Sequence, residues 1–274
     1  MKKIMTGGLF VLAAVSQAGT MTWNFDDNLA SMEDGSLLGQ NGSAASGAYE
    51  FVDDMINGQT ARVLKLTRNQ VDNAANPWLN MSNPFAPNGG GTMLNQYSIV
   101  MDVKVSSDGD RYNSFMQTDL TNTSDGDAFW DSSTSVDRGG IGISGDYSDA
   151  GNPLRFSGDV WHRVVLTMDL TQPAGNSSGW QAFVDGALQN VVQSPSGYGV
   201  DGRYAIGSAL LLFADDDNEM KNMNFINNLQ FVDRALSANE VADLGGPTAG
   251  AVPEPASMGL LALGAAALLR RRKA

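Results

Sequence analysis

Apolar and polar residues alternate with a period of two through much of residues 19–235. The clearest case is 97–105, where the odd positions are apolar and most even positions are polar. Because successive side chains of a strand point to opposite faces of a sheet, this alternation predicts a strand with one face in a core and one in solvent. Similar patterns predict strands at 61–66, 160–168, 180–184, 205–213 and 225–232.

Turn and capping residues separate these segments. An Asp-Gly pair at 185–186 lies between apolar residues and favours a two-residue hairpin turn with positive φ at both positions. Ser237 and Glu240 have the spacing of a capping box, and glycines at 245–246 end the one short helix that we expect. Many short strands separated by turn residues predict an all-β fold, an antiparallel two-sheet sandwich.

The first 18 residues have the pattern of a secretory signal peptide. A basic start at 1–3 precedes an apolar run at 9–15, and small residues two apart follow at Ser16 and Ala18. This order of features predicts export and cleavage after Ala18. The alternative, a buried N-terminal helix, is disfavoured because the run is short and has no amphipathic face.

The C-terminal residues 252–274 form a second targeting segment. A Pro-Glu-Pro motif is followed by an apolar stretch at 256–269 and then by a basic cluster. Fourteen helical residues rise about 21 Å, which is less than the roughly 30 Å of a bilayer core, so insertion needs snorkelling flanks or a thinned bilayer. The residues that carry the pattern are Pro253, Glu254, Pro255, Arg270, Arg271 and Arg272.

This tripartite tail resembles the PEP-CTERM sorting signal of Gram-negative bacteria that make exopolysaccharide. The resemblance implies a single short transmembrane helix, recognition by an exosortase-type processing enzyme and cleavage near the motif. The protein is then transiently anchored in the inner membrane and afterwards reaches the cell surface or the extracellular space. A plain tail anchor is the alternative. Residues 247–251 are expected to be a small-residue linker between the folded domain and this tail.

Composition excludes several function classes. Between the two targeting segments, residues 19–251 hold 11 basic and 29 acidic residues, and so acidic a body repels phosphate backbones and argues against nucleic-acid binding. Cysteine is absent, which excludes disulfides, thiolate metal sites and cysteine nucleophiles. His162 is the single histidine, so a multi-histidine zinc site is impossible and a Ser-His-Asp triad is disfavoured. Cations, neutral sugars and basic partners remain as ligands.

A family resemblance is carried by three segments in the second half of the chain. In order, they are the sequence Trp-His-Arg-Val at 161–164, the hairpin at 183–186, and a late strand followed by 234–241. This set resembles the laminin-G-like members of the concanavalin A-like lectin/glucanase superfamily. The resemblance implies one jelly-roll domain over 19–246, whose concave sheet or rim loops bind sugars, commonly with calcium.

An acidic cluster is the most conspicuous candidate site. If the chain stays extended after Phe213, then Asp215, Asp217 and Glu219 project from one face, and three carboxylates together suit calcium. The alternative is a solvated acidic turn. Glucanases of the superfamily carry Glu-x-Asp-x-(x)-Glu on one strand, which makes a polysaccharide hydrolase a second alternative, but position 215 is Asp where that pattern has Glu.

Aromatic side chains in loop-like surroundings are candidate sugar platforms, because a flat ring stacks on the apolar face of a pyranose. The candidates are Trp130, Tyr112 and Tyr147, and the alternative is burial in the core. We therefore expect a non-catalytic, exported surface or matrix protein that binds extracellular polysaccharide or mediates adhesion, with calcium as a candidate cofactor. A structural matrix protein that binds no glycan is the remaining alternative.

Overall fold

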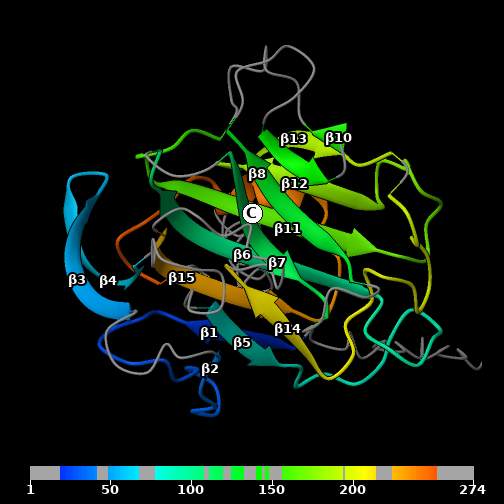
Figure 1. The fold of residues 1–274 in the computed structure, drawn as a ribbon, viewed down its shortest axis with the longest axis horizontal. Helices are drawn as coiled ribbons and strands as arrows, with labels where there is room; N and C mark the ends of the chain where they lie inside the picture. Colours follow the sequence, from blue (N-terminus) through cyan, green and yellow to red (C-terminus); the bar gives the residue numbers. More distant parts are fainter. Residues whose placement is uncertain are drawn as a thin grey trace, which may run out of the picture.

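In the computed structural model, the described residues form two antiparallel sheets and one short helix (Figure 1). The all-β two-sheet sandwich predicted by the alternation, and the jelly roll implied by the family resemblance, are thereby confirmed. The described residues are 19–41, 49–67, 78–107, 111–119, 125–132, 140–143, 146–147, 156–193, 195–213 and 224–251. The expected signal peptide and the expected membrane helix lie outside them, and no helix among them is long and apolar enough to cross a bilayer.

The larger sheet has the strand order β13-β12-β11-β6-β15-β4-β3, and β1 also pairs with β15. Its long central strands come from distant parts of the chain, so the sheet ties the two halves of the sequence together. The bounds are β1 Thr20–Trp23, β3 Tyr49–Ile56, β4 Gln59–Leu66, β6 Gln96–Val105, β11 His162–Asp169, β12 Trp180–Val184, β13 Ala187–Val191 and β15 Asn224–Val232.

The smaller sheet has the order β10-β9-β8-β7-β14-β5-β2. Its bounds are β2 Gly39–Asn41, β5 Trp78–Ser82, β7 Tyr112–Gln117, β8 Asp127–Asp131, β9 Gly140–Ile143, β10 Asp146–Tyr147 and β14 Ala209–Leu212. Apolar side chains from the facing sides of both sheets make the main core, with Trp180, Phe115 and Phe231 among the fully buried rings. This is the packing expected of a sandwich, where each sheet contributes alternate residues to a shared interior.

Strand β6 differs from its expected environment. Its odd positions enter the main core as predicted, but Ser98, Val100 and Asp102 on the other face are also fully buried. Helix α1 (Ala238–Leu244) covers part of that outer face, where its Val241 packs in one cluster with Val100. The strand is therefore buried on both faces, because the chain returns after β15 and lies over the larger sheet.

Local signals at the end of the chain are confirmed. Ser237 caps helix α1, and Glu240 completes the capping box by accepting a hydrogen bond of 2.9 Å from the backbone N–H of Ser237. The β12–β13 hairpin turns at Asp185 and Gly186, with φ of 51° and 83°. Both are positive, as the Asp-Gly pair predicted.

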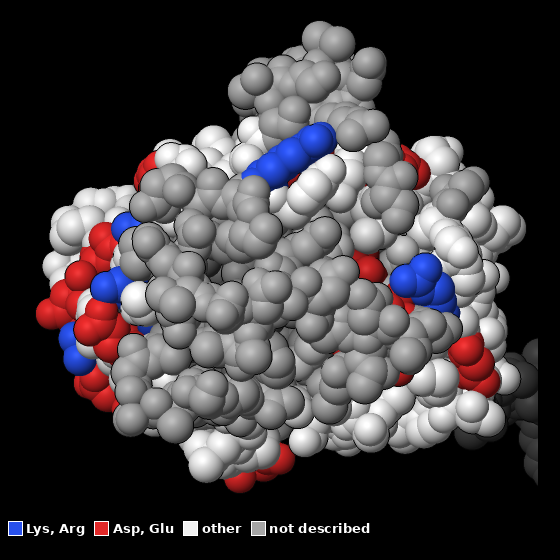
Figure 2. All heavy atoms as spheres, in the orientation of Figure 1, with Lys and Arg blue, Asp and Glu red and all other residues white. Residues whose placement is uncertain are grey.

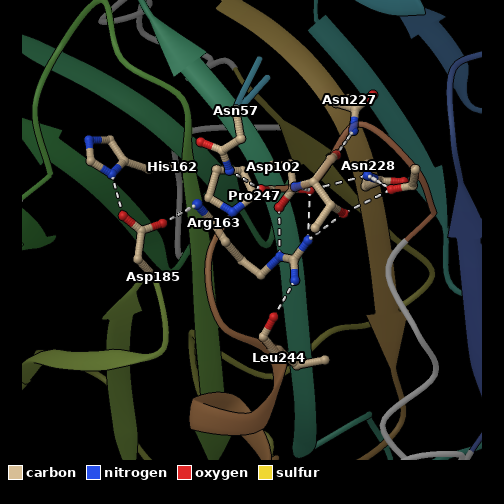
Figure 3. A network of polar contacts seen from close by, with 11 residues as sticks. Asn57, Asp102, His162, Arg163, Asp185, Asn227, Asn228, Leu244 and Pro247 are labelled. Carbon is tan, nitrogen blue, oxygen red and sulfur yellow. Dashed lines mark hydrogen bonds and ion pairs between the residues drawn. The ribbon is translucent and has the colours of Figure 1, made fainter. Parts of the chain in front are cut away.

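Residues 245–250, which we call the C-terminal strap, follow helix α1 across the outer face of the larger sheet (Figure 3). Beneath the strap, the guanidinium of Arg163 forms two hydrogen bonds of 2.7 and 2.8 Å with the carboxylate of Asp102, and both side chains are fully buried. The predicted linker thus lies against the domain, above a buried ion pair.

Candidate functional site

Loops at one end of the smaller sheet line an open pocket of about 310 Å³, which we call the cavity. Thr118 and Asp119 follow the end of β7, and the loop that leads to β14 contributes Asp201, Gly202 and Arg203. Because β7 and β14 are antiparallel neighbours, the end of one and the start of the other meet at the same rim. Jelly-roll topology therefore brings together residues that are more than 80 positions apart.

One wall of the cavity is held by Asp201. Its carboxylate accepts hydrogen bonds of 2.8–3.0 Å from the backbone N–H groups of Thr92 and Met93 and from the side chain of Asn95. The bonds from Thr92 and Asn95 are the main reason why the pKa of Asp201 falls to about 2. Asp201 is therefore ionised at neutral pH. Its hydrogen bonds fasten the 195–206 loop, which we call the cavity loop, to the segment before β6.

A second wall is built around Arg203. Its Nε donates a hydrogen bond to the backbone oxygen of Asp125, and its Nη2 lies 3.6 Å from the carboxylate of Asp125. The hydroxyl of Thr118 donates to the backbone oxygen of Arg203 and accepts a bond of 2.8 Å from the N–H of Gly126. These bonds connect the end of β7, the start of β8 and the cavity loop, so the guanidinium has a defined position.

Glycine is required at Gly197 beside this arginine. A Cβ at that position would lie 2.5 Å from the Arg203 side chain, and φ is +69°, a conformation that residues with a Cβ rarely adopt.

The cavity thus combines a guanidinium, carboxylates, a hydroxyl and exposed loop backbone. Such a set can donate and accept hydrogen bonds around a neutral, polyhydroxylated ligand, and the volume is at the lower end of ordinary ligand pockets.

The structure separates the three predicted aromatic platforms. Trp130 is only 3% exposed and packs against Phe156 with ring centroids 5.0 Å apart. The expectation of an exposed ring is therefore wrong for Trp130, because strand β8 turns it into the core. Tyr112 and Tyr147 are half-buried neighbours with centroids 6.3 Å apart. Their role in sugar binding stays a prediction.

These two tyrosines do not join the cavity. Tyr112 begins β7 and Thr118 follows its last residue, so the two sites lie at opposite ends of a strand, roughly 20 Å apart. The guanidinium of Arg111 lies 4.8 Å from the ring centre of Tyr112 and donates one hydrogen bond to each carboxylate oxygen of Asp131. The tyrosine pair is thus a separate place at the other end of β7, beside an arginine whose charge is paired with Asp131.

The predicted calcium ligands Asp215, Asp217 and Glu219 lie outside the described residues, which end at Phe213 before this cluster and resume at Asn224. Within the described ranges, no group of three or more histidine or acidic side chains is arranged to hold a metal ion. Calcium binding at the acidic cluster therefore stays a prediction.

The single histidine has two side-chain partners, and nothing in the sequence indicated that both lie beside it. His162 Nδ1 lies 2.8 Å from Asp185 Oδ2 (Figure 3), and His162 Nε2 lies 3.0 Å from Ser157 Oγ. The backbone N–H of Ser157 also points at Nε2, at 3.4 Å, which favours the tautomer with the proton on Nδ1. The hairpin register could have placed Asp185 beside His162, but Ser157 comes from a loop without such a signal.

Comparisons with known proteins identify the tail and the fold. Residues 251–273 match the PEP-CTERM protein-sorting motif, which confirms the resemblance seen in the sequence and implies export and sorting by an exosortase. No curated protein matches the sequence. Domain 4 of AbnA, a GH43 extracellular arabinanase from Geobacillus stearothermophilus solved in complex with arabinotriose, has a similar structure, with a TM-score of 0.50 and 14% identity over 83% of this chain and 98% of that chain.

Two further solved structures are similar at a lower level. The binding domain of botulinum neurotoxin serotype G has a TM-score of 0.47 and 12% identity, and the binding domain of Paraclostridial Mosquitocidal Protein 1 has a TM-score of 0.48 and 12% identity. They are matched over 82% and 83% of this chain, which spans 49% and 51% of those chains.

Proposed function

We propose that this is an exosortase-sorted surface or matrix protein whose jelly-roll domain binds extracellular polysaccharide in the cavity beside Arg203. The cavity is the observation that carries the proposal, because its lining mixes hydrogen-bond donors and acceptors on a fixed scaffold. The shared fold with an arabinanase domain that was solved with arabinotriose adds support. The sorting motif supports delivery of the domain to the cell exterior, where polysaccharide is present.

The charge of the domain narrows the class of glycan. With 29 acidic against 11 basic residues in 19–251, the surface repels polyanions at long range. At the β3–β4 end of the molecule, acidic side chains lie beside basic ones (Figure 2), as in the ion pairs of Asp27 with Arg62 and of Glu50 with Lys65. A neutral polysaccharide such as an arabinan or a glucan therefore suits the protein better than a uronate polymer.

The test is retention of the purified domain on an array of neutral and acidic polysaccharides. We expect binding to neutral glycans, and we expect Arg203→Met to weaken it by roughly tenfold, since a hydrogen bond to a charged donor is worth about 1.5–3 kcal/mol. Arg62→Met, at an exposed ion pair of the larger sheet, is the matched control. Equal loss in both variants would contradict the assignment to the cavity.

Two other array outcomes lead to different functions. Turnover of a polysaccharide that Glu219→Gln abolishes would identify the protein as a glycoside hydrolase. Neither retention nor turnover of any glycan would leave a structural matrix role, in which the acidic surface serves solubility and ion bridging.

We further propose that Asp215, Asp217 and Glu219 bind one calcium ion. Calorimetric titration of calcium into the domain is expected to give a saturable signal, and Asp215→Asn together with Asp217→Asn is expected to remove it, because neutral amides are weaker calcium ligands than carboxylates. Chelation should then also weaken glycan retention if the ion shapes the rim. A titration without heat in the wild-type protein would refute the site.

A second candidate function, hydrolysis of acyl esters, is favoured by the contacts of His162. In this function Ser157 Oγ attacks an ester carbonyl while His162 takes its proton and passes it to the departing alcohol, and Asp185 holds the imidazole. Water then hydrolyses the acyl-serine and releases the acid. A fluorophosphonate probe tests it directly. Labelling of the wild-type protein that disappears in both Ser157→Ala and His162→Ala would establish the nucleophile, and an unlabelled wild-type protein would exclude it.

A further inference from the structure

Polar side chains of the larger sheet bind the backbone of the C-terminal strap and of the helix residue before it. Arg163 Nη1 donates to the carbonyl of Leu244 at 2.6 Å, Asn227 to that of Thr248 at 2.6 Å and Asn228 to that of Gly250 at 3.0 Å. Asn57 in the β3–β4 turn donates a hydrogen bond of 2.7 Å to the carbonyl of Pro247 (Figure 3). Asp102 accepts a hydrogen bond of 3.3 Å from the N–H of Thr248. We call Asn57, Asp102, Arg163, Asn227 and Asn228 the clasp.

The strand register of the larger sheet explains why the clasp residues lie side by side. Arg163, Asp102 and Asn228 are direct partners across β11, β6 and β15, so they form one row on the outer face. Asn227 is the bulged residue of β15, and a bulge lets two consecutive side chains turn to the same face. Two adjacent asparagines can therefore each donate a hydrogen bond to a carbonyl of the strap.

The strap also packs through its apolar residue. Ala249 lies against a cluster on the same outer face that contains Ile56, Val63 and Trp161. Apolar contacts, three bonds from the side chains of Asn57, Asn227 and Asn228 to carbonyls of the strap, and the bond from the N–H of Thr248 to Asp102 together hold the strap on the β3–β4 turn and on strands β6 and β15. The folded domain therefore binds its C-terminal segment as far as Gly250.

The sorting motif begins directly after the clasped residues. The matched segment starts at Ala251, and three Cα–Cα steps separate Gly250 from Pro253. These steps span at most about 11 Å. A protein that grips the Pro-Glu-Pro sequence while the clasp is closed must therefore come within about 11 Å of the domain surface.

We propose that the face of the domain where the strap ends is a contact surface for the membrane-bound sorting enzyme that processes the tail. The face consists of the strap and the adjoining β3–β4 hairpin, whose turn residue Asn57 holds Pro247. Gln59 on this hairpin is exposed and is the cross-strand partner of Ile56, so it lies on the side of the hairpin that packs with Ala249 of the strap. This inference rests on the proposed processing of the tail by an exosortase-type enzyme.

Site-specific photo-crosslinking in the full-length protein tests the surface. A photoreactive amino acid at Gln59 is introduced in cells that carry an epitope-tagged sorting enzyme, and Val200, 45% exposed in the cavity loop, is the matched control position. We expect crosslinks to the tagged enzyme from Gln59 and not from Val200. Inserting about 12 Gly and Ser residues between Ala251 and Val252 should lower the crosslink yield about tenfold, since effective concentration falls with roughly the −3/2 power of tether length.

The outcomes separate this inference from the proposed function. A tail that is processed normally while Gln59 does not crosslink to the enzyme, or crosslinks only to lipid, overturns the contact surface alone. Crosslinks that the insertion leaves unchanged overturn the argument from tether length and with it the proposal. A tail that the enzyme does not process at all overturns both.

Discussion

Arg163→Met is expected to lower the free energy of unfolding by about 3–5 kcal/mol, because it leaves the buried carboxylate of Asp102 without its cation. The guanidinium also binds the carbonyl of Leu244 and the hydroxyl of Thr248. Both groups lose a partner in the variant, and an unsatisfied buried polar group adds its own cost. Against the 5–15 kcal/mol that stabilise an ordinary domain, this is a large fraction.

Urea unfolding followed by tryptophan fluorescence measures the change. Asp102→Asn should have an effect of similar size, since it leaves the arginine as the unpaired charge. Arg62→Met is the matched control, because Arg62 bonds Asp27 and Asp53 at the surface, and exposed pairs contribute about 0–1 kcal/mol. Equal destabilisation by Arg62→Met and Arg163→Met would show that burial of the pair is not what matters.

Gly202→Ala is expected to weaken glycan binding in the cavity strongly. A Cβ on Gly202 would lie 2.3 Å from the backbone oxygen of Gly197 and 2.9 Å from that of Gly199. These oxygens accept the hydrogen bonds that close the loop, from Arg203 and Gly202, each 2.9 Å long. Because backbone cannot move aside as a flexible side chain can, the loop must open and Arg203 must shift.

For this variant we expect at least a tenfold loss of glycan affinity and a stability loss of about 1–3 kcal/mol, the usual cost of overpacking. Gly250→Ala is the matched control, since a Cβ there meets nothing within 4 Å. Affinity is read from array or calorimetric titration and stability from urea unfolding. A Gly202→Ala protein that binds as well as the wild type would show that the cavity loop is not the glycan site.

Much of the fold followed from local rules. The alternation at 97–105 became the central strand β6, the Asp-Gly pair became the β12–β13 turn, and the Ser237 capping box became the start of helix α1. Each of these signals acts between residues close in sequence, through side-chain direction, φ preference or a capping bond. Such signals are visible without knowledge of the tertiary structure.

The candidate sites were less predictable. Trp130 stands among acidic residues in the sequence, yet β8 turns it inward against Phe156, and whether a ring on a short strand faces in or out depends on the register of that strand. The cavity was missed because Thr118 and Arg203 meet only when β7 and β14 pair. Ser157 was missed for the same reason, since its contact with His162 depends on the path of a loop.

The sequence by itself determined that this chain is an exported β-sandwich with a sorting tail, because period-two burial, turn residues and targeting segments are written in neighbouring positions. Only the tertiary structure decided the surroundings of Asp102 and Arg163. In the sequence they are polar residues on alternating strands and should face water. In the fold the strap covers them, and their charges satisfy each other and the returning backbone. Contacts between residues 60 to 150 positions apart depend on the whole topology, which no local pattern encodes.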